Sequence, residues 1–172
     1  MAEPSTARSL KRTSSPRKAA AAVADVDTSY LETLTGYNAR RAALTIISVF
    51  LERMAQYQLR PVDFSVLSLI AHNPGITSRQ LCGALDILPP NLVGMLRDLE
   101  GRGVIEKREH PTDRRAQGLH LSAAGKKLYA KAQRTASQLE LDTLSDLSPQ
   151  ERETLHSLLR RVYRPPKGPA AS

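Results

Sequence analysis

The sequence predicts a mainly α-helical protein with one small β-hairpin, and three observations support this fold class. Apolar residues recur at helical spacing through most of residues 29–164. Two capping-box patterns, Thr77–Gln80 and Ser148–Glu151, mark helix starts. Two short stretches, Val104–Glu109 and Gly118–Leu121, flank a charged segment, which is the pattern of two strands joined by a turn.

The composition indicates which class of partner and which cellular compartment to expect. The 172 residues carry a formal net charge of +8, which favours a polyanionic partner such as nucleic acid. Cys82 is the only cysteine, so no intrachain disulfide can form and we expect a reducing, cytoplasmic setting. Every apolar run is far shorter than the ~18 residues needed to cross a bilayer, so we expect no membrane partner.

The two ends of the chain lack hydrophobic periodicity and are expected to be disordered. Residues 1–28 form a basic arm rich in Ser and Ala, and residues 165–172 form a short tail. We interpret the arm as a source of non-specific attraction for a polyanion, and a targeting segment is the alternative.

A long helix is expected from about Ser29 to Gln58, within residues 29–60. An apolar stripe at helical spacing supports this prediction. The stripe consists of Ala43, Leu44, Ile47, Phe50, Leu51 and Met54.

Two short helices joined by a turn are expected next. The first covers Val62 to Ala71 and ends before the turn Asn73-Pro74-Gly75. The second begins at the Thr77 capping box, and its expected buried side is formed by Leu81, Ala84 and Leu85.

A third short helix precedes the hairpin. It begins at Pro89-Pro90, because proline is tolerated in the first turn of a helix, and it stops at Gly101-Arg102-Gly103. The i, i+4, i+7 spacing of Leu92, Leu96 and Leu99 points these side chains to a core. Helix, helix-turn-helix and hairpin in this order predict a winged helix-turn-helix domain over residues 61–121.

Two further helices are expected in residues 122–164. One runs from about Ala123 to Leu144, and the other follows the Ser148 capping box and stops before Pro165. With residues 29–60 they offer more apolar surface than one winged domain needs. We therefore predict a homodimer built from long N- and C-terminal dimerisation helices; a monomeric helical cap is the alternative.

At this point the sequence resembles the MarR family of bacterial regulators over about residues 35–163. The segments that carry the resemblance are Asn73–Leu81, Leu99–Arg108, Asp113-Arg114-Arg115 and Leu121–Gly125, in this order and spacing. The resemblance implies a homodimer that binds a pseudo-palindromic operator in double-stranded DNA, usually represses, and is released by a small molecule. The chain departs from the family where Ser or Thr often opens the third helix and Pro89-Pro90-Asn91 stands instead, which affects the expected base preference.

The third helix is expected to lie in the major groove as the recognition helix. Asn91 can pair with adenine through two hydrogen bonds or cap the helix start, and Gly94 lets the backbone approach DNA. Arg97 can contact phosphate or pair with Asp98 or Glu100. The DNA-facing residues expected on this helix are Pro90, Asn91, Gly94, Met95 and Arg97.

Other contacts with DNA are expected at the start of the preceding helix and along the hairpin, or wing. Unpaired amides at a helix start favour phosphate, and basic strand residues add charge. By the family pattern Arg115 enters the minor groove and Asp113 holds it; a solvated turn is the alternative. The expected residues are Ser78, Arg79, Gln80, Lys107, Arg108, Asp113, Arg114 and Arg115.

Arg40 is the strongest sequence indication of an effector site, because it falls within the apolar stripe of the first helix and needs a partner there. It can hold an anionic ligand or form an ion pair at the dimer interface. Tyr37, Arg41, Tyr57 and His72 flank the same region; His72 can equally be an ordinary helix-end histidine. Because many relatives respond to aromatic acids, a small aromatic or heteroaromatic carboxylate is the expected effector.

The remaining signals argue against other classes. No P-loop, G-x-S-x-G or H-E-x-x-H motif occurs, and the four histidines lack metal-type spacing, so we expect neither an enzyme, nor a cofactor, nor a metal. Cys82 fits a buried structural thiol better than a redox sensor, since no second cysteine can resolve it. A non-specific architectural DNA-binding protein, suggested by the basic arm, is one rival function, and a regulator without a small-molecule ligand is the other.

Overall fold

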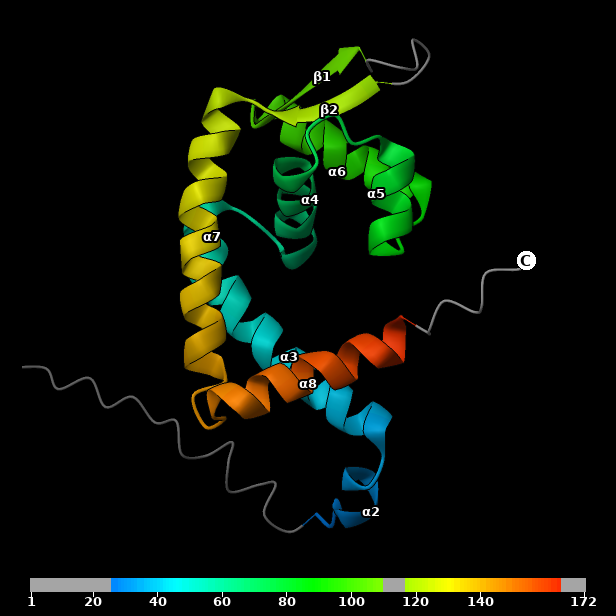
Figure 1. Cartoon of the computed structure of the whole chain (residues 1–172), viewed down its shortest axis with the longest axis vertical. Helices are drawn as coiled ribbons and strands as arrows, with labels where there is room; N and C mark the ends of the chain where they lie inside the picture. Colours follow the sequence, from blue (N-terminus) through cyan, green and yellow to red (C-terminus); the bar gives the residue numbers. More distant parts are fainter. Residues whose placement is uncertain (1–25, 110–116, 165–172) are drawn as a thin grey trace, which may run out of the picture. The chain divides into compact units, whose positions relative to one another are not determined.

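A computed structural model describes residues 26–109 and 117–164, and within them the chain is mainly helical with one two-stranded hairpin (Figure 1). This confirms the predicted fold class. The elements are α2 (Ser29–Glu32), α3 (Thr35–Met54), the 3₁₀ turn η1 (Ala55–Tyr57), α4 (Pro61–His72), α5 (Ser78–Leu85), α6 (Pro89–Gly101), β1 (Ile105–Glu109), β2 (Gln117–Leu121), α7 (Ala123–Thr143) and α8 (Pro149–Tyr163). The predicted arm through residue 25, the wing tip and the tail lie outside the described residues.

The chain divides into two compact units, Met1–Arg41 and Ala42–Ser172. In the first unit, the prediction of one continuous helix from Ser29 is wrong, because α2 ends at Glu32 and α3 begins at Thr35. The Asn38 side-chain amide donates to the carbonyls of Glu32 and Leu34 at 2.7 and 3.0 Å. It thus provides the Glu32 carbonyl with a partner that the interrupted helix does not supply.

In the second unit the predicted helix starts are confirmed. Thr77 and Ser148 each form a complete capping box with the residue three positions on, Gln80 and Glu151. The Ser122 hydroxyl accepts from the Gly125 amide and so caps α7. Local hydrogen bonding alone places these three boundaries, which is why the sequence indicates them well.

The core is centred on the winged helix-turn-helix region, where Leu81, Leu92, Leu96 and Leu99 are buried. Buried residues of α3 (Phe50, Met54) and α7 (Tyr129, Ala132, Leu139) belong to the same cluster. Ala84 was expected to be buried but is exposed, and Leu85 is half-buried, because only one side of the short helix α5 meets its neighbours. Helix α4 packs against α5, α7 and β2, so it is the central element of this region (Figure 1).

The hairpin pairs β1 with β2 in antiparallel register, with Ile105 opposite Leu121 and Glu109 opposite Gln117. The base of the hairpin packs closely against α7 at Gly125. A Cβ added to this glycine would lie 1.8 Å from the Val104 carbonyl oxygen. Only glycine permits this approach. The Leu121–Gly125 segment therefore has a structural cause: a capping serine followed by a glycine that lets α7 pack on the root of the wing.

The terminal helices differ from this core. Leu44, Ile47 and Leu51 on α3 are 41 to 49% exposed in the single chain, and α8 has no buried residue. Four large apolar side chains of α8 are exposed: Leu158, Leu159, Val162 and Tyr163. The apolar stripes predicted from helical periodicity therefore exist, but much of their surface is not covered within one chain.

Candidate nucleic-acid interface

Helix α6 has one buried face and one exposed face. Leu92, Leu96 and Leu99 are each at most 4% exposed and fix the helix against the core. The helix begins at Pro89 with Leu88 at the N-cap, so Asn91 lies inside the first turn and does not occupy the capping position. The residues predicted to meet DNA are exposed, except for half-buried Met95: Pro90, Asn91, Gly94 and Arg97.

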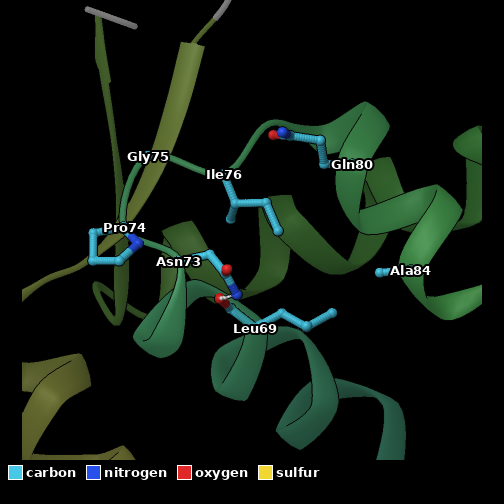
Figure 2. Close-up of a pocket in the computed structure, with 7 residues that line it drawn as sticks. All are labelled: Leu69, Asn73, Pro74, Gly75, Ile76, Gln80 and Ala84. Atoms are coloured by element: carbon cyan, nitrogen blue, oxygen red, sulfur yellow. Dashed lines mark hydrogen bonds between the residues drawn. The ribbon is translucent and has the colours of Figure 1, made fainter.

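The start of α5 presents a second candidate contact. Ser78, Arg79 and Gln80 are exposed at its first turn, where backbone amides lack intrahelical partners. Figure 2 shows Gln80 beside the turn that joins α4 to α5, at the edge of a hollow of about 540 Å³. The side chains of Asn73 and Gln80 are held by bonds to Leu69 and Thr77, so this hollow is shaped mainly by the turn itself.

Strand β1 carries the two basic residues predicted to contact phosphate, and the structure pairs both with glutamates. Lys107 Nζ lies 2.6 Å from a carboxylate oxygen of Glu100, and Arg108 pairs with Glu106. All four side chains are substantially exposed, and such surface pairs contribute little to stability. A phosphate can therefore replace either glutamate at low cost. Asp113, Arg114 and Arg115 lie outside the described residues.

A buried acid links α4 to the C-terminal end of α6. Asp63 is 5% exposed, and the Arg60 guanidinium donates to both of its oxygens at 2.9 and 3.0 Å. Burial alone would raise the pKa of Asp63. Hydrogen bonds from the Arg60 side chain and amide, with the charges of Arg60 and Arg102, outweigh burial and hold this pKa below its ordinary 3.8.

The five residues predicted to bind an effector divide between the two units. Tyr37 is half-buried and Arg40 and Arg41 are exposed in the α3 segment of the first unit. Tyr57 and His72 belong to the second unit.

Tyr57 and His72 both lie beside α7, but at different levels. The Tyr57 hydroxyl is 3.0 Å from Thr135 Oγ1, while the His72 ring meets the edge of Tyr129 at 6.0 Å between centroids. These contact points are six residues apart along α7, or roughly 9 Å. His72 Nδ1 also lies 2.8 Å from the Ser68 carbonyl, the bond of an ordinary helix-end histidine.

Two residues that sequence reasoning missed organise this region. Tyr129 is buried, stacks on Phe64 and donates from its hydroxyl to Ser68 Oγ at 3.0 Å. Arg102 donates to two backbone carbonyls of the segment after α3. Neither residue belongs to a motif that indicates its role. Tyr129 lies inside a predicted helix, and Arg102 lies in the predicted helix stop Gly101-Arg102-Gly103.

A cavity of about 320 Å³ in the second unit combines Arg108, Lys126 and His120 with apolar Ile70 and Leu121. Positive groups over an apolar floor suit an anion with an apolar body. A hollow of about 720 Å³ lies where Tyr163 and Arg164 of the α8 end face Ser65, Ser68 and the α5 end, and Asp86 lines it as well.

Residues 26–109 and 117–164 hold no cluster of His, Cys, Asp or Glu of the kind that binds a metal ion. Over the same ranges no helix has the length and apolar character to cross a membrane. Cys82 is half-buried and packs against the core.

Comparison with known proteins gives the same fold and a regulatory class. The MarR family model matches residues 57–116, which span α4 to the wing. A transcriptional regulatory protein of Thauera aromatica, assigned to the hcr operon, is 31% identical over 130 residues, covering 75% of this chain and 78% of that protein.

Solved structures of the transcriptional repressor CouR are also similar. The form bound to a 23-mer DNA duplex is 36% identical with a TM-score of 0.76, covering 82% of this chain and 100% of that one. The form bound to p-coumaroyl-CoA is 34% identical with a TM-score of 0.73, covering 82% of this chain and 99% of that one.

Proposed function

The chain belongs to the MarR family of transcriptional regulators, and from this premise we propose a specific mode of action. It acts as a homodimer in the cytoplasm, binds a pseudo-palindromic operator, and represses until a small anionic aromatic effector releases it. The observation that carries DNA recognition is the two-faced helix α6: three leucines anchor it, while Asn91, Gly94 and Arg97 stay free to meet a groove.

The DNA contact proposed for each residue follows from the chemistry of its side chain. Asn91 reads adenine, Gly94 lets the helix backbone approach, and Met95 adds apolar contact to bases. Phosphate contacts come from the α5 start and from β1, and Arg115 held by Asp113 reads the width of the minor groove. The proposed phosphate and wing contacts are Ser78, Arg79, Gln80, Lys107, Arg108 and Arg114. Pro90 and Arg97 are further proposed contacts within α6.

The homodimer proposal is supported by the uncovered apolar surface of α3 and α8. A second copy of the chain is the occupant that fits, because a symmetric pair buries the same stripe twice. A dimer also places two recognition helices about 34 Å apart, as successive major grooves require.

The first experiment tests specificity. Genomic fragments bound by the protein are isolated and sequenced, and the recovered operator then competes with random DNA in a fluorescence-anisotropy titration at fixed salt. We expect the operator to compete on the order of 1,000-fold better than random DNA. Equal competition at physiological salt would support a non-specific architectural protein instead.

A variant pair identifies the base reader. Asn91→Ala should weaken operator binding by about 10- to 100-fold and relax the preference at one base pair, with little change on random DNA. Arg134→Ala, on an exposed position of α7, is the control and should bind as the natural chain does. A uniform loss on all sequences in Asn91→Ala would remove Asn91 as a reader.

The effector proposal is supported by the ligand of the CouR relative, which carries an aromatic acyl group and several negative charges. We assign the anion to Arg40 and Arg41, and the ring to Tyr37, Tyr57 and His72. A thermal-shift screen of aromatic carboxylates and their CoA thioesters tests this, with Arg40→Ala as the variant. A ligand that raises Tm by several degrees should lose that effect in Arg40→Ala. No shift with any compound would overturn the proposal.

A further inference from the structure

Arg102 makes two hydrogen bonds that join elements distant in sequence. Its Nη1 donates to the Gln58 carbonyl at 2.9 Å and its Nη2 to the Tyr57 carbonyl at 2.8 Å. Arg102 is the residue after α6, at the C-cap. The fork of one guanidinium therefore connects the end of the recognition helix to the segment that closes the dimerisation helix, and charge-assisted bonds of this kind are the stronger ones.

The acceptor side of this connection has a defined backbone shape. After α3 the chain tightens into the 3₁₀ turn η1, and Gln58 adopts the left-handed conformation with φ 53° and ψ 44°. That conformation is unfavourable for a residue other than glycine and persists only where surrounding contacts hold it. The next residue, Leu59, is buried at 3% exposure. The two carbonyls are thus presented outward by a turn that is anchored on the core.

Further charged side chains lie near the connection that Arg102 makes. Arg60 begins α4 and holds buried Asp63, while the charge of Arg102 also acts on Asp63. Asp98, near the end of α6, faces the same hollow of about 520 Å³ as Arg60 and Arg102. The ends of α3, α4 and α6 therefore meet around one cluster of alternating charges.

We propose that Arg102 is a positioning residue that sets the orientation of the recognition helix relative to the end of the dimerisation helix. The inference rests on the proposed function, because orientation matters only if two copies must fit two half-sites. Helix α6 packs mainly on α5 and β1, so the Arg102 fork provides a direct polar connection to the segment that follows α3. Both terminal nitrogens of its guanidinium donate to the backbone of the same chain.

The test measures tolerance of half-site spacing. Operators with the natural spacing and with one base pair inserted or removed are titrated with the natural chain, Arg102→Ala and Arg102→Lys. One base pair rotates a half-site by roughly 35°, so a rigid dimer should bind the altered operators poorly. Arg102→Ala should bind the natural operator about tenfold more weakly and should discriminate less between spacings. Arg102→Lys should be intermediate, since an ammonium lacks the two-pronged fork.

Arg53→Ala is the matched control, because Arg53 also joins distant elements, through a 2.6 Å pair between α3 and Asp142 on α7 that involves no residue of α6. It should keep the natural spacing preference. A merely structural role for Arg102 would lower affinity for every operator by the same factor. An unchanged ratio between spacings in Arg102→Ala would therefore overturn the proposal.

A second measurement keeps this inference separate from the proposed function. Spin labels are placed at Gln56→Cys and Val93→Cys in a Cys82→Ser background, with labelled chains diluted into unlabelled protein. The distance between the labels, measured by pulsed electron paramagnetic resonance without DNA, should be narrowly distributed in the natural chain and broader in Arg102→Ala. Equal widths in folded samples would overturn the positioning role. A broader width with no operator preference in the natural chain would retain that role and reject the proposed function.

Discussion

The winged helix-turn-helix region and the terminal helices share the same apolar periodicity, but their apolar side chains differ in how far one chain buries them. Leu92, Leu96 and Leu99 of α6 are buried within one chain. Leu44, Ile47 and Leu51 of α3, and Leu158 and Leu159 of α8, remain about half exposed. The core of the winged region is therefore complete within one chain, whereas the terminal helices retain a surface that a second copy can cover.

The largest expected effect is on assembly. Leu158→Glu places a charge on the uncovered face of α8 in both copies, so the dimer should weaken on the order of 1,000-fold because burying an unpaired carboxylate is costly. Sedimentation velocity over a range of concentrations measures the change. Leu88→Glu is the matched control, since Leu88 is 70% exposed at the start of α6, and it should leave the oligomeric state unchanged. A dimer of normal strength in Leu158→Glu would assign the apolar face another role.

The next effect contrasts a buried leucine with an exposed one. Leu96→Ala should lower the free energy of unfolding by about 3 kcal/mol, because it leaves a cavity in the core. Urea titrations at several protein concentrations provide the measurement. The cost of Leu96→Ala should be the same at every concentration. Leu51→Ala should cost less, and its cost should grow with protein concentration, because it weakens association and not the core. A larger loss of stability in Leu51→Ala than in Leu96→Ala would contradict this contrast between a buried and an exposed leucine.

Two glycines on helices give a smaller pair of opposite effects. Gly125→Ala should destabilise the fold by about 2 kcal/mol, because the new methyl group would collide with the Val104 carbonyl. Gly94→Ala meets nothing within 4 Å and should stabilise the isolated protein by up to ~1 kcal/mol through helix propensity. Gly94→Ala should nevertheless bind operator more weakly. Thermal unfolding combined with a DNA titration separates the two results, and unimpaired binding would deny Gly94 a place against DNA.

The smallest effect is a pH dependence within the charge cluster. Because the folded-state pKa of Asp63 is lowered, its contribution to stability is present above the unfolded pKa and is lost as pH falls through the folded pKa. Asp63→Asn should therefore cost about 1 kcal/mol from pH 7 to pH 5 and progressively less below about pH 4. Urea unfolding of both proteins at four pH values checks this. A gap that grows in acid would be inconsistent with the lowered pKa.

Local signals in the sequence were sufficient for most of the fold. Capping boxes, prolines at first turns and 3.6-residue periodicity act over a few neighbouring residues, so they located α5, α6, α8 and the wing. The same periodicity correctly placed the exposed face of α6. Segment order and spacing then indicated the family.

Other features depended on particular side-chain contacts that helical or strand periodicity does not encode. Periodicity did not indicate that Asn38 would bond back to α2 and interrupt the first helix, or that Lys107 and Arg108 would pair with glutamates. The assignments of Asn91, Arg40 and Arg115 to DNA or effector remain predictions, because they concern partners beyond the single chain.

The type of each principal element and most of the helix starts could be predicted from the sequence, since these follow from backbone hydrogen bonding and side-chain spacing over one or two turns. Tertiary structure decided which apolar faces are covered and which charges are already paired. Arg102 shows the division clearly: in the sequence it stands between two glycines as part of a helix stop, and in the fold it bonds to carbonyls 44 and 45 residues away. Such a role depends on distances in space that no local pattern encodes.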